Sequence, residues 1–327
     1  MINQFPDEFT VMCHYHLNQF FAFKHPFFNI APEVKNNLNP TDPVIVDATD
    51  NTELDQLVNK LKNNGYENVI YLTSNITESN GNDIIYFPAW LYSSSLRYSQ
   101  LNRVSIGDKR NYLVSCINRN CFPHKVYTYL QFLKRDYISR SAVSFSNSYC
   151  IDAKLVPLDL SKSPFIDEFP KDIIDEIRQL SLYRELPNHD INWQNDHSFD
   201  NVAFTDSYLN ITTETRHKFS LFTEKTAKTL ASGQLFLQVN GQGSIDGLRT
   251  LGLNTFDSVF NNHDYDNQSN FMNRIDQMFL LLDTVIPNLE DIYHSNVSAI
   301  RDNQDYFLSG AFRARMEKNL RDRDLIV

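Results

Sequence analysis

Residues 206–233, DSYLNITTETRHKFSLFTEKTAKTLASG, decide the fold of this chain. Tyr208 to Thr213 alternates in polarity and is rich in β-branched residues, which predicts a strand. Thr223 predicts the N-cap of a short helix over EKTAKTLA, and Gly233 predicts its end. A second apolar run, Leu235 to Val239, predicts the next strand. The stretch is therefore expected to form a strand–helix–strand unit of a parallel sheet.

Two charged residues, Glu224 and Lys225, stand in the first turn of this predicted helix. A crossover helix begins at the carboxyl edge of a parallel sheet, where open α/β sheets bind their ligands. A lysine beside the N–H groups of a helix N-terminus suits an anion such as a diphosphate, and a neighbouring carboxylate suits sugar hydroxyls. In the alternative interpretation, Glu224 offsets the helix dipole and Lys225 is a solvated side chain.

The segment SYLNITTET…FSLFTEKTAKTLASGQLFLQV resembles the donor-site motif of the α-1,3-fucosyltransferase family, and it is similar to bacterial and phage sugar transferases with a TEK motif. The similarity extends downstream through LRTLGLNTF to HDYD, and less closely back to Asn111. In the family, the TEK glutamate binds the nucleotide ribose and the lysine binds the diphosphate, which implies these roles for Glu224 and Lys225. The resemblance also places Glu214 and Thr223 in the donor site.

A second strand–loop–helix unit precedes this stretch. Tyr112 to Ile117 predicts a strand, and HKVYTYLQFLKR after Pro123 predicts an amphipathic helix. Two cations, Arg119 and Lys125, then lie at a carboxyl edge. The fucosyltransferase resemblance implies a phosphate-binding arginine early in this helix, a position that Lys125 takes here, with Arg119 as its rival. A solvated helix face is the alternative for Lys125.

The N-terminal part of the chain alternates short strands with a helix, which predicts a Rossmann-like domain over residues 1–108. The helix is predicted over Thr52–Lys62 and the strands at Phe9–His14, Pro43–Asp47, Val69–Thr73 and Ile84–Phe87. The aromatic stretch YFPAWLYSSSLRY that follows is expected to be irregular. The polar GDKR sequence at 107–110 marks the expected domain boundary.

The predicted fold class is α/β, and the resemblance implies a GT-B-like arrangement of two Rossmann-like domains that face a central cleft. The second domain, residues 109–300, is expected to bind the nucleotide sugar. It includes a short strand over Ala142–Ser146 and an acidic, proline-rich connection from Asp159 to Asn201 with one helix. Further helices are predicted at Phe271–Ile286 and, as one long helix, at Asn288–Arg321; residues 301–327 are expected to cross back to the first domain.

Composition limits the partners. The 30 basic and 40 acidic residues give a net charge of −10, which disfavours a broad DNA-binding surface, although not a local groove. We see no signal peptide and no window that is apolar enough for a transmembrane segment, so we expect a cytoplasmic protein, bacterial or viral. The four cysteines form no CxxC pair, which favours reduced, buried thiols over a zinc site with His124.

Two short motifs carry weaker signals. Asp264-Tyr265-Asp266 has the DxD pattern of metal-dependent glycosyltransferases, but it lies between predicted helices, so a capping or loop-closing role is expected. GQG at 241–243 lacks the third glycine of a dinucleotide fingerprint and is expected to form a turn. No metal or other cofactor is expected, because Lys125, Lys225 and the helix turn at 223–225 would stabilise a leaving diphosphate.

An inverting sugar transfer needs one general base at the acceptor hydroxyl. The resemblance implies a carboxylate of the N-terminal domain; Asp47 and Asp50 at the end of PVIVD are the candidates, with His14 and His16 as rivals. The chain is therefore predicted to be a glycosyltransferase that moves a sugar from a nucleotide-sugar donor to a hydroxyl of a glycan or another acceptor. The alternatives are a phage-type DNA-base glycosyltransferase and a non-catalytic nucleotide-sugar-binding protein.

Overall fold

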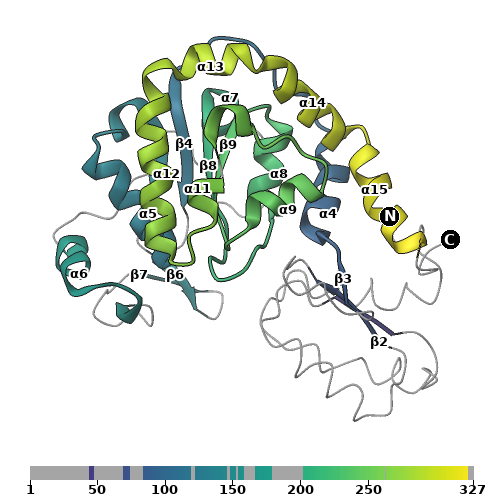
Figure 1. Ribbon diagram of the computed structural model, residues 1–327, viewed down its shortest axis with the longest axis horizontal. Coiled ribbons are helices and arrows are strands. Elements are labelled where there is room, and N and C mark those ends of the chain that lie inside the picture. The colour runs from purple at the N-terminus through teal and green to yellow at the C-terminus, as the bar shows by residue number, and fades with distance from the viewer. Residues whose placement is uncertain are drawn as a thin grey trace. The chain divides into compact units, whose positions relative to one another are not determined.

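The computed structural model describes residues 44–47, 69–73, 84–118, 122–145, 148–151, 154–157, 166–178, 202–261 and 263–322. The chain divides into two compact units, one of Met1–Ala89 with Arg313–Val327 and one of Trp90–Phe312 (Figure 1). The division at Ala89 and Trp90 lies before the boundary expected at residue 108.

A four-stranded parallel sheet forms the centre of the larger unit. Its strands, in the spatial order β5-β4-β8-β9, are β5 (Ser141–Phe145), β4 (Tyr112–Asn118), β8 (Ser207–Thr213) and β9 (Leu235–Val239). Every residue of β5, β8 and β9 is buried. Such continuous burial is typical of a parallel sheet that is covered on both faces, and the fold class is α/β.

The strand order creates a topological switch point between β4 and β8, where the connections from two neighbouring strands lead to opposite edges of the sheet. From β4 the chain passes through α5 (Pro123–Lys134) to β5 at one edge, and from β8 it passes through α8 (Glu224–Ala231) to β9 at the other edge. Because such crossovers are right-handed, α5 and α8 cover opposite faces of the sheet, as Figure 1 shows. Open α/β sheets bind ligands at the carboxyl ends of strands that diverge in this way.

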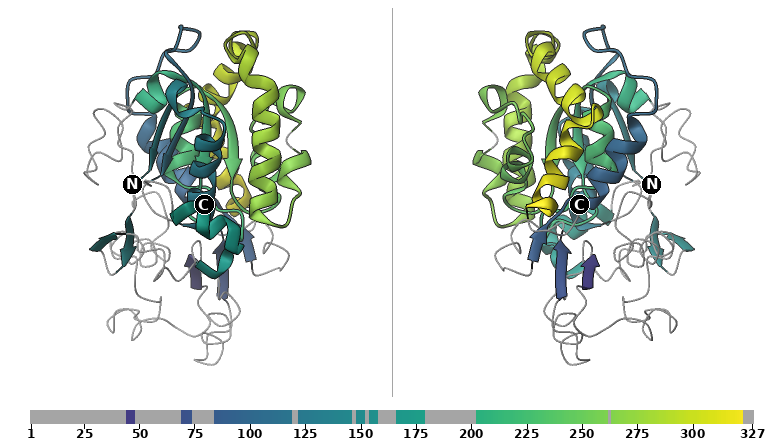
Figure 2. Two further views of the ribbon diagram at one scale, coloured as in Figure 1. Left: turned by 90° about the vertical axis from the view of Figure 1, so that its left-hand side faces the viewer. Right: turned by 90° about the vertical axis from the view of Figure 1, so that its right-hand side faces the viewer.

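Two further helices complete the layers. On one face α12 (Phe271–Val285) packs against α5, and on the other α14 (Val297–Leu308) packs against α8; Figure 2 shows the helices around the strands from both sides. The sequence encodes their starts locally. Pro123 stands in the first turn of α5, where its missing N–H costs nothing. The Asn270 side chain caps α12 by accepting hydrogen bonds from the N–H groups of Met272 and Asn273.

Shorter elements fill the connections of the chain. The helices are α4 (Ala89–Tyr98), α6 (Lys171–Arg178), α7 (Val202–Thr205), α9 (Ser244–Thr250), α10 (Asp257–Phe260), α11 (His263–Asp266), α13 (Leu289–Ser295) and α15 (Ala311–Arg321). The described residues also include the 3-10 turns η3 (Ile138–Arg140), η5 (Ile166–Glu168) and η7 (Ile286–Asn288). Strands β6 (Ser148–Ile151) and β7 (Lys154–Pro157) form an antiparallel pair.

The smaller unit contains a second parallel sheet. Its strands β1 (Val44–Asp47), β2 (Val69–Thr73) and β3 (Ile84–Tyr86) pair in the order β1-β2-β3. The predicted strands at 43–47, 69–73 and 84–87 are thereby confirmed. The predicted strand at Phe9–His14 and the predicted helix at Thr52–Lys62 lie outside the described residues.

Most predicted elements of the larger unit are also confirmed, to within a few residues at their ends: β4, α5, β5, α6, β8, α8, β9 and α12. The β6–β7 pair was not predicted.

The prediction of irregular structure at residues 86–98 is the first that needs correction. Residues 89–98 form the helix α4. Burial explains the helix, since Leu91 and Tyr98 are at most 1 % exposed and Ser95 Oγ donates a hydrogen bond to the Phe307 carbonyl. Tertiary packing thus overrides the weak helix propensity of three consecutive serines.

The prediction of one long C-terminal helix over Asn288–Arg321 is wrong, and this is the second correction. The segment is three helices, α13, α14 and α15. The chain leaves helical geometry at Asn296, with φ −108°, and again at Gly310, with φ +92°. Glycine adopts the left-handed conformation without a steric penalty, so it separates α14 from α15.

Gly241 follows β9 and lies against the backbone of the loop before α8. A Cβ here would lie 2.2 Å from the carbonyl carbon of Phe219 and 2.4 Å from the nitrogen of Ser220. Because backbone atoms cannot move aside as a flexible side chain can, we expect Gly241→Ala to lower the free energy of unfolding by about 3 kcal/mol. Urea denaturation would measure the loss. Gly243→Ala is the matched control: its Cβ would meet nothing within 4 Å, and its φ of +77° alone costs about 1 kcal/mol. Equal losses would contradict the close contact.

Candidate anion-binding site

The carboxyl ends of β4 and β8 lie beside the beginnings of two helices. β4 ends at Asn118 shortly before α5, and β8 ends at Thr213 shortly before α8. Thr213 Oγ1 donates a hydrogen bond to Asn118 Oδ1, which joins the two strand ends. Each helix N-terminus is the positive end of a helix dipole. The switch point therefore carries a positive backbone potential from two directions.

The Glu214 carboxylate fixes the position of α8. Its side chain is fully buried, and its Oε1 accepts hydrogen bonds from the Thr223 N–H at 3.0 Å and from Thr226 Oγ1 at 2.6 Å. Its Oε2 accepts from Thr223 Oγ1. The donors all belong to the N-cap and first turn of α8, so Glu214 ties the end of β8 to the start of the helix. The structure thus places this predicted donor-binding residue under the helix as a support.

Glu224 and Lys225 form an ion pair in the first turn of α8. Lys225 Nζ lies 2.9 Å from Glu224 Oε1 and also donates to Thr223 Oγ1 at 3.1 Å. Both side chains are about one quarter exposed. Burial favours the neutral acid, but the charge and hydrogen bond of Lys225 outweigh it and lower the pKa of Glu224 to about 2. A carboxylate and an ammonium therefore stand together at the rim of the switch point at neutral pH.

Lys125, in the first turn of α5, is a buried cation. It is 2 % exposed, and its ammonium has no hydrogen-bond or ion-pair partner within the part of the chain that the structure describes; Nζ lies 5.8 Å from the centre of the Phe122 ring. Burial, and then the positive charge of Lys225, lower the pKa of Lys125 to about 7, against the opposing charges of Glu214 and Glu224. An unpaired buried ammonium is costly, so the site is electrostatically prepared for an anion.

The structure brings most of the predicted donor residues together. Glu214, Thr223, Glu224 and Lys225 share the β8–α8 connection, and the charges of Lys225, Glu214 and Glu224 all act on Lys125. Arg119, the rival of Lys125, lies outside the described residues, as do Asp50, His14 and His16. Asp47 is the last residue of β1 in the smaller unit.

Sequence reasoning missed two histidines beside the site. His124 Nε2 lies 2.7 Å from the Glu214 carbonyl oxygen, and His124 Nδ1 lies 3.1 Å from Nδ1 of His217. His124 was considered only as a zinc ligand, and its partner lies 93 positions away in the chain. The one local signal is the HK dipeptide at 124–125, which puts His124 beside Lys125.

The capping role predicted for the DYD motif is confirmed for Asp266. Its Oδ1 accepts a hydrogen bond from Ser244 Oγ and its Oδ2 from the Ile245 N–H, both at 2.9 Å, at the start of α9. Tyr265 is buried, and its hydroxyl accepts from the Gln238 N–H. Among the residues that the structure describes, no group of three or more His, Cys, Asp and Glu side chains could hold a metal ion.

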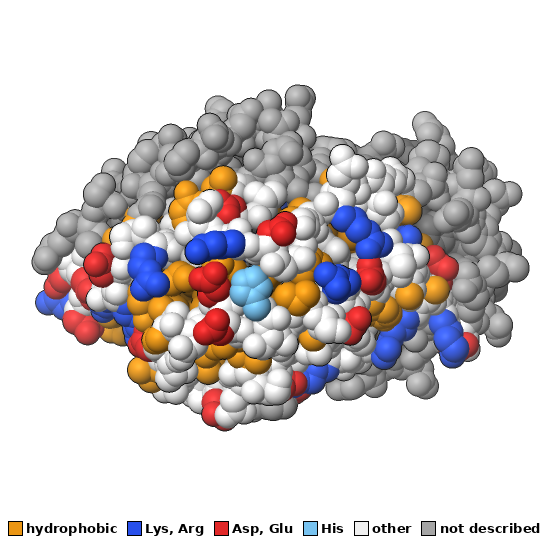
Figure 3. All heavy atoms as spheres, turned by 90° about the horizontal axis from the view of Figure 1, so that it is seen from above, with side chains coloured by type: hydrophobic (Ala, Val, Ile, Leu, Met, Phe, Trp, Pro, Cys, Tyr) orange, Lys and Arg blue, Asp and Glu red, His pale blue; other side chains and the backbone are white. Residues whose placement is uncertain are grey.

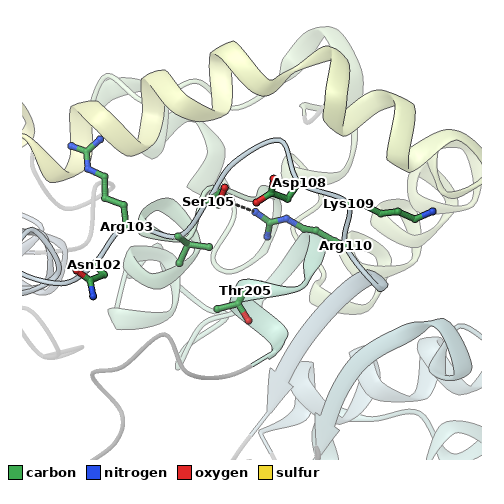
Figure 4. Close-up of a pocket in the computed structure, with 8 residues that line it drawn as sticks. Asn102, Arg103, Ser105, Asp108, Lys109, Arg110 and Thr205 are labelled. Carbon is green, nitrogen blue, oxygen red and sulfur yellow. Dashed lines mark hydrogen bonds between the residues drawn. The ribbon is translucent and has the colours of Figure 1, made fainter.

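A cavity of about 360 Å³ lies at the opposite edge of the same sheet (Figure 4), lined by residues 102–105, 108–110 and Thr205. Its cations do not converge on a ligand. Arg103 and Lys109 extend in opposite directions, and Arg103 forms an ion pair with Asp305. The buried Arg110 guanidinium is already bonded to the carbonyl oxygens of Ser207, Gly233 and three further residues. The chemistry thus favours the carboxyl edge.

Charge at the amino edge is mixed rather than basic. On the described surface seen from the side of α13 and α14, Lys and Arg side chains alternate with Asp and Glu side chains (Figure 3). No helix in the described part of the chain is both long and apolar enough to span a membrane. Comparison with protein-family models, with curated proteins and with solved structures found no match to this chain.

Replacing Lys125 should stabilise the protein. Because its pKa is about 7 in the folded chain, well below the 10.5 of an ordinary lysine, folding disfavours its charge. We expect Lys125→Met to raise the free energy of unfolding by about 2–4 kcal/mol at pH 7 and below. The gain should shrink as the pH rises from 7 towards 10.5, because the folded wild type then loses the buried charge while the unfolded chain keeps it.

Urea denaturation of both proteins between pH 6 and about pH 9.5 would measure this difference. Lys134→Met is the matched control, since Lys134 ends the same helix and pairs with Glu176 at the surface; it should change stability by less than about 1 kcal/mol. A destabilised Lys125→Met would show that the ammonium has a partner.

Proposed function

We propose that this protein is a glycosyltransferase whose larger unit binds the diphosphate of a nucleotide sugar at the β4–β8 switch point. The observation that carries the proposal is the buried ammonium of Lys125, for which the described residues provide no hydrogen-bond or ion-pair partner, beside Lys225 at the start of α8. The resemblance of residues 206–266 to a sugar-donor motif falls on the same residues, which supports a nucleotide sugar over other anions.

The charges suit a diphosphate. Burial, and after it repulsion between the Lys125 and Lys225 ammonium groups, lowers the pKa of Lys125. A diphosphate would remove this repulsion, offset the cost of burying Lys125 and be stabilised by the positive end of the α8 dipole. Glu224, ionised because its pKa is about 2, would accept hydrogen bonds from ribose hydroxyls. Binding would also keep Lys125 protonated, so affinity should fall as the pH rises above 7.

The same groups would assist the chemistry. Transfer of the sugar breaks the bond between the anomeric carbon and the diphosphate oxygen, and negative charge collects on the leaving diphosphate. Lys125, Lys225 and the α8 dipole are fixed before the reaction and would stabilise that charge, which is how preorganised sites lower a barrier. The reaction so proposed inverts the sugar and needs no metal ion.

We further propose a GT-B-like arrangement in which the smaller unit presents the acceptor hydroxyl and the general base. Asp47 ends β1 at the carboxyl end of the parallel β1–β2–β3 sheet, the edge at which such sheets bind ligands. Asp50 follows it in the sequence. Either carboxylate could take the hydroxyl proton as the sugar is transferred.

Calorimetric titration with UDP, GDP, CDP and ADP tests the donor site. We expect one of them to bind, and Lys225→Ala to weaken it by about 10- to 150-fold, because a charge-assisted hydrogen bond contributes about 1.5–3 kcal/mol. Lys134→Ala, at the other end of α5, should bind like the wild type. The proposal fails if no nucleotide binds, or if Lys225→Ala binds as tightly as the wild type.

Turnover separates an enzyme from a binding protein. With the sugar of the preferred nucleotide and water as the acceptor, we expect the wild type to release nucleoside diphosphate slowly, and Asp47→Asn or Asp50→Asn to lower that rate by about 10²- to 10⁴-fold with unchanged donor affinity. Release that neither variant slows would exclude both carboxylates as the base. Donor that binds without ever turning over would indicate a non-catalytic protein.

A further inference from the structure

A chain of three side chains, Glu168, His217 and His124, borders the candidate anion site. Glu168 ends η5, His217 lies in the loop between β8 and α8, and His124 lies in the first turn of α5. Nε2 of His217 is 3.2 Å from Glu168 Oε2, and Nδ1 of His217 is 3.1 Å from Nδ1 of His124. His124 Nε2 is 2.7 Å from the Glu214 carbonyl oxygen. We call these three side chains the imidazole bridge.

A count of protons defines the state of the imidazole bridge. Its two ends are a carboxylate and a carbonyl oxygen, which accept hydrogen bonds, and its centre is a contact between two ring nitrogens. Three hydrogen bonds therefore need three protons, but two neutral imidazoles carry only two N–H groups. The observed distances thus fit a bridge that holds one extra proton, as an imidazolium opposite the Glu168 carboxylate. Without that proton, one nitrogen lone pair faces an acceptor.

The extra proton belongs with His217. His217 faces the carboxylate, whereas His124 is fully buried next to Lys125. Burial and the positive charges of His217, Lys125 and Lys225 lower the pKa of His124 well below its usual value. Burial also lowers the pKa of His217, against the charge of Glu168, and the charges of Lys218 and Arg274 lower it further. The bridge with all three hydrogen bonds formed, which we call the closed bridge, is therefore favoured at low pH. It is lost as the pH rises through the pKa of His217.

The bridge holds together segments that are distant in sequence. On the side of α12, the Phe271 ring packs against both His217 and Phe169, the residue after η5. Arg274 of the same helix donates hydrogen bonds to the carbonyl oxygens of His217 and Asn240. Closing the bridge thus docks η5 onto the loop that leads into α8 and onto the first turn of α5.

We infer that the imidazole bridge is a protonation-dependent positioning device that docks η5 against the loop before α8 and favours anion binding at Lys125 and Lys225. The charged groups that face it are Lys125 and Lys225 from α5 and α8, Lys218 and Glu168 from its own loop and η5, and Arg274 from α12. A bound anion reduces the positive charge around the bridge and so favours its extra proton. By linkage, the extra proton favours the anion to the same degree. This second step rests on the proposed function; the bridge itself does not.

NMR titration of the imidazole nitrogens in the intact protein tests the bridge without any ligand. The His217 signals can be assigned among nine histidines by their loss in His217→Gln. We expect Glu168→Gln to lower the pKa of His217 by about 1 unit or more, because an opposite charge at hydrogen-bond distance is removed. Lys218→Gln removes a like charge from a side chain that is 72 % exposed and should raise it. Backbone signals of Ile166 to Phe169 should titrate with the same midpoint as His217.

Two results would overturn the bridge: a His217 pKa that Glu168→Gln leaves unchanged, or signals of residues 166–169 that do not follow His217. The second arm adds pyrophosphate to the wild type, where we expect it to raise the His217 pKa, and to Lys125→Met, where the rise should be smaller or absent. An unchanged His217 pKa with pyrophosphate bound would refute the coupling. Failure of pyrophosphate to bind would instead count against the proposed function, and the ligand-free arm would still decide the bridge.

Discussion

The buried carboxylate of Glu214 is the constraint on which the candidate site depends. A carboxylate in the interior is tolerated only when its oxygens accept enough hydrogen bonds, and here Thr223 and Thr226 of α8 supply them. The backbone of the same residue donates to the Val239 carbonyl of β9, and its own carbonyl faces His124 of α5. One residue therefore sets the start of α8 relative to two strands and to α5. The positions of Glu224, Lys225 and Lys125 follow from it.

Short sequence patterns were enough to predict the strand–helix–strand unit that contains Glu214. The β-branched run of β8, the N-cap at Thr223 and Gly233 with φ +64° each act within a few residues, and each is found where it was expected. The helix α4 and the breaks at Asn296 and Gly310 were not predicted, because burial and a single backbone angle decide them. The role of Glu214 also needed the structure. A glutamate after a strand looks the same in sequence whether it faces a ligand or supports a helix.

Away from the candidate site, buried polar groups of the sheet form hydrogen bonds with one another. Ser115 Oγ accepts hydrogen bonds from Ser207 Oγ and Asn210 Nδ2, across neighbouring strands. The Gln234 amide donates to the carbonyl oxygens of Ala203 and Ser207. These groups satisfy one another within the protein, and such a network rigidifies a fold. It needs no ligand to be complete.

Two buried cations at opposite edges of the sheet, Arg110 and Lys125, differ in whether the described residues supply hydrogen-bond acceptors for them. Arg110, 4 % exposed, donates to five carbonyl oxygens and the Tyr293 hydroxyl, and its guanidinium lies 5.0 Å from the centre of that ring. Lys125, 2 % exposed, has no such partner in the described part of the chain. The fold can therefore satisfy a buried cation fully, and it does so at the edge where the cation is structural. An ammonium buried to the same degree, for which the described residues supply no acceptor, costs stability that a bound anion would return. That difference, rather than the size of a cavity, is why the carboxyl edge is the candidate site.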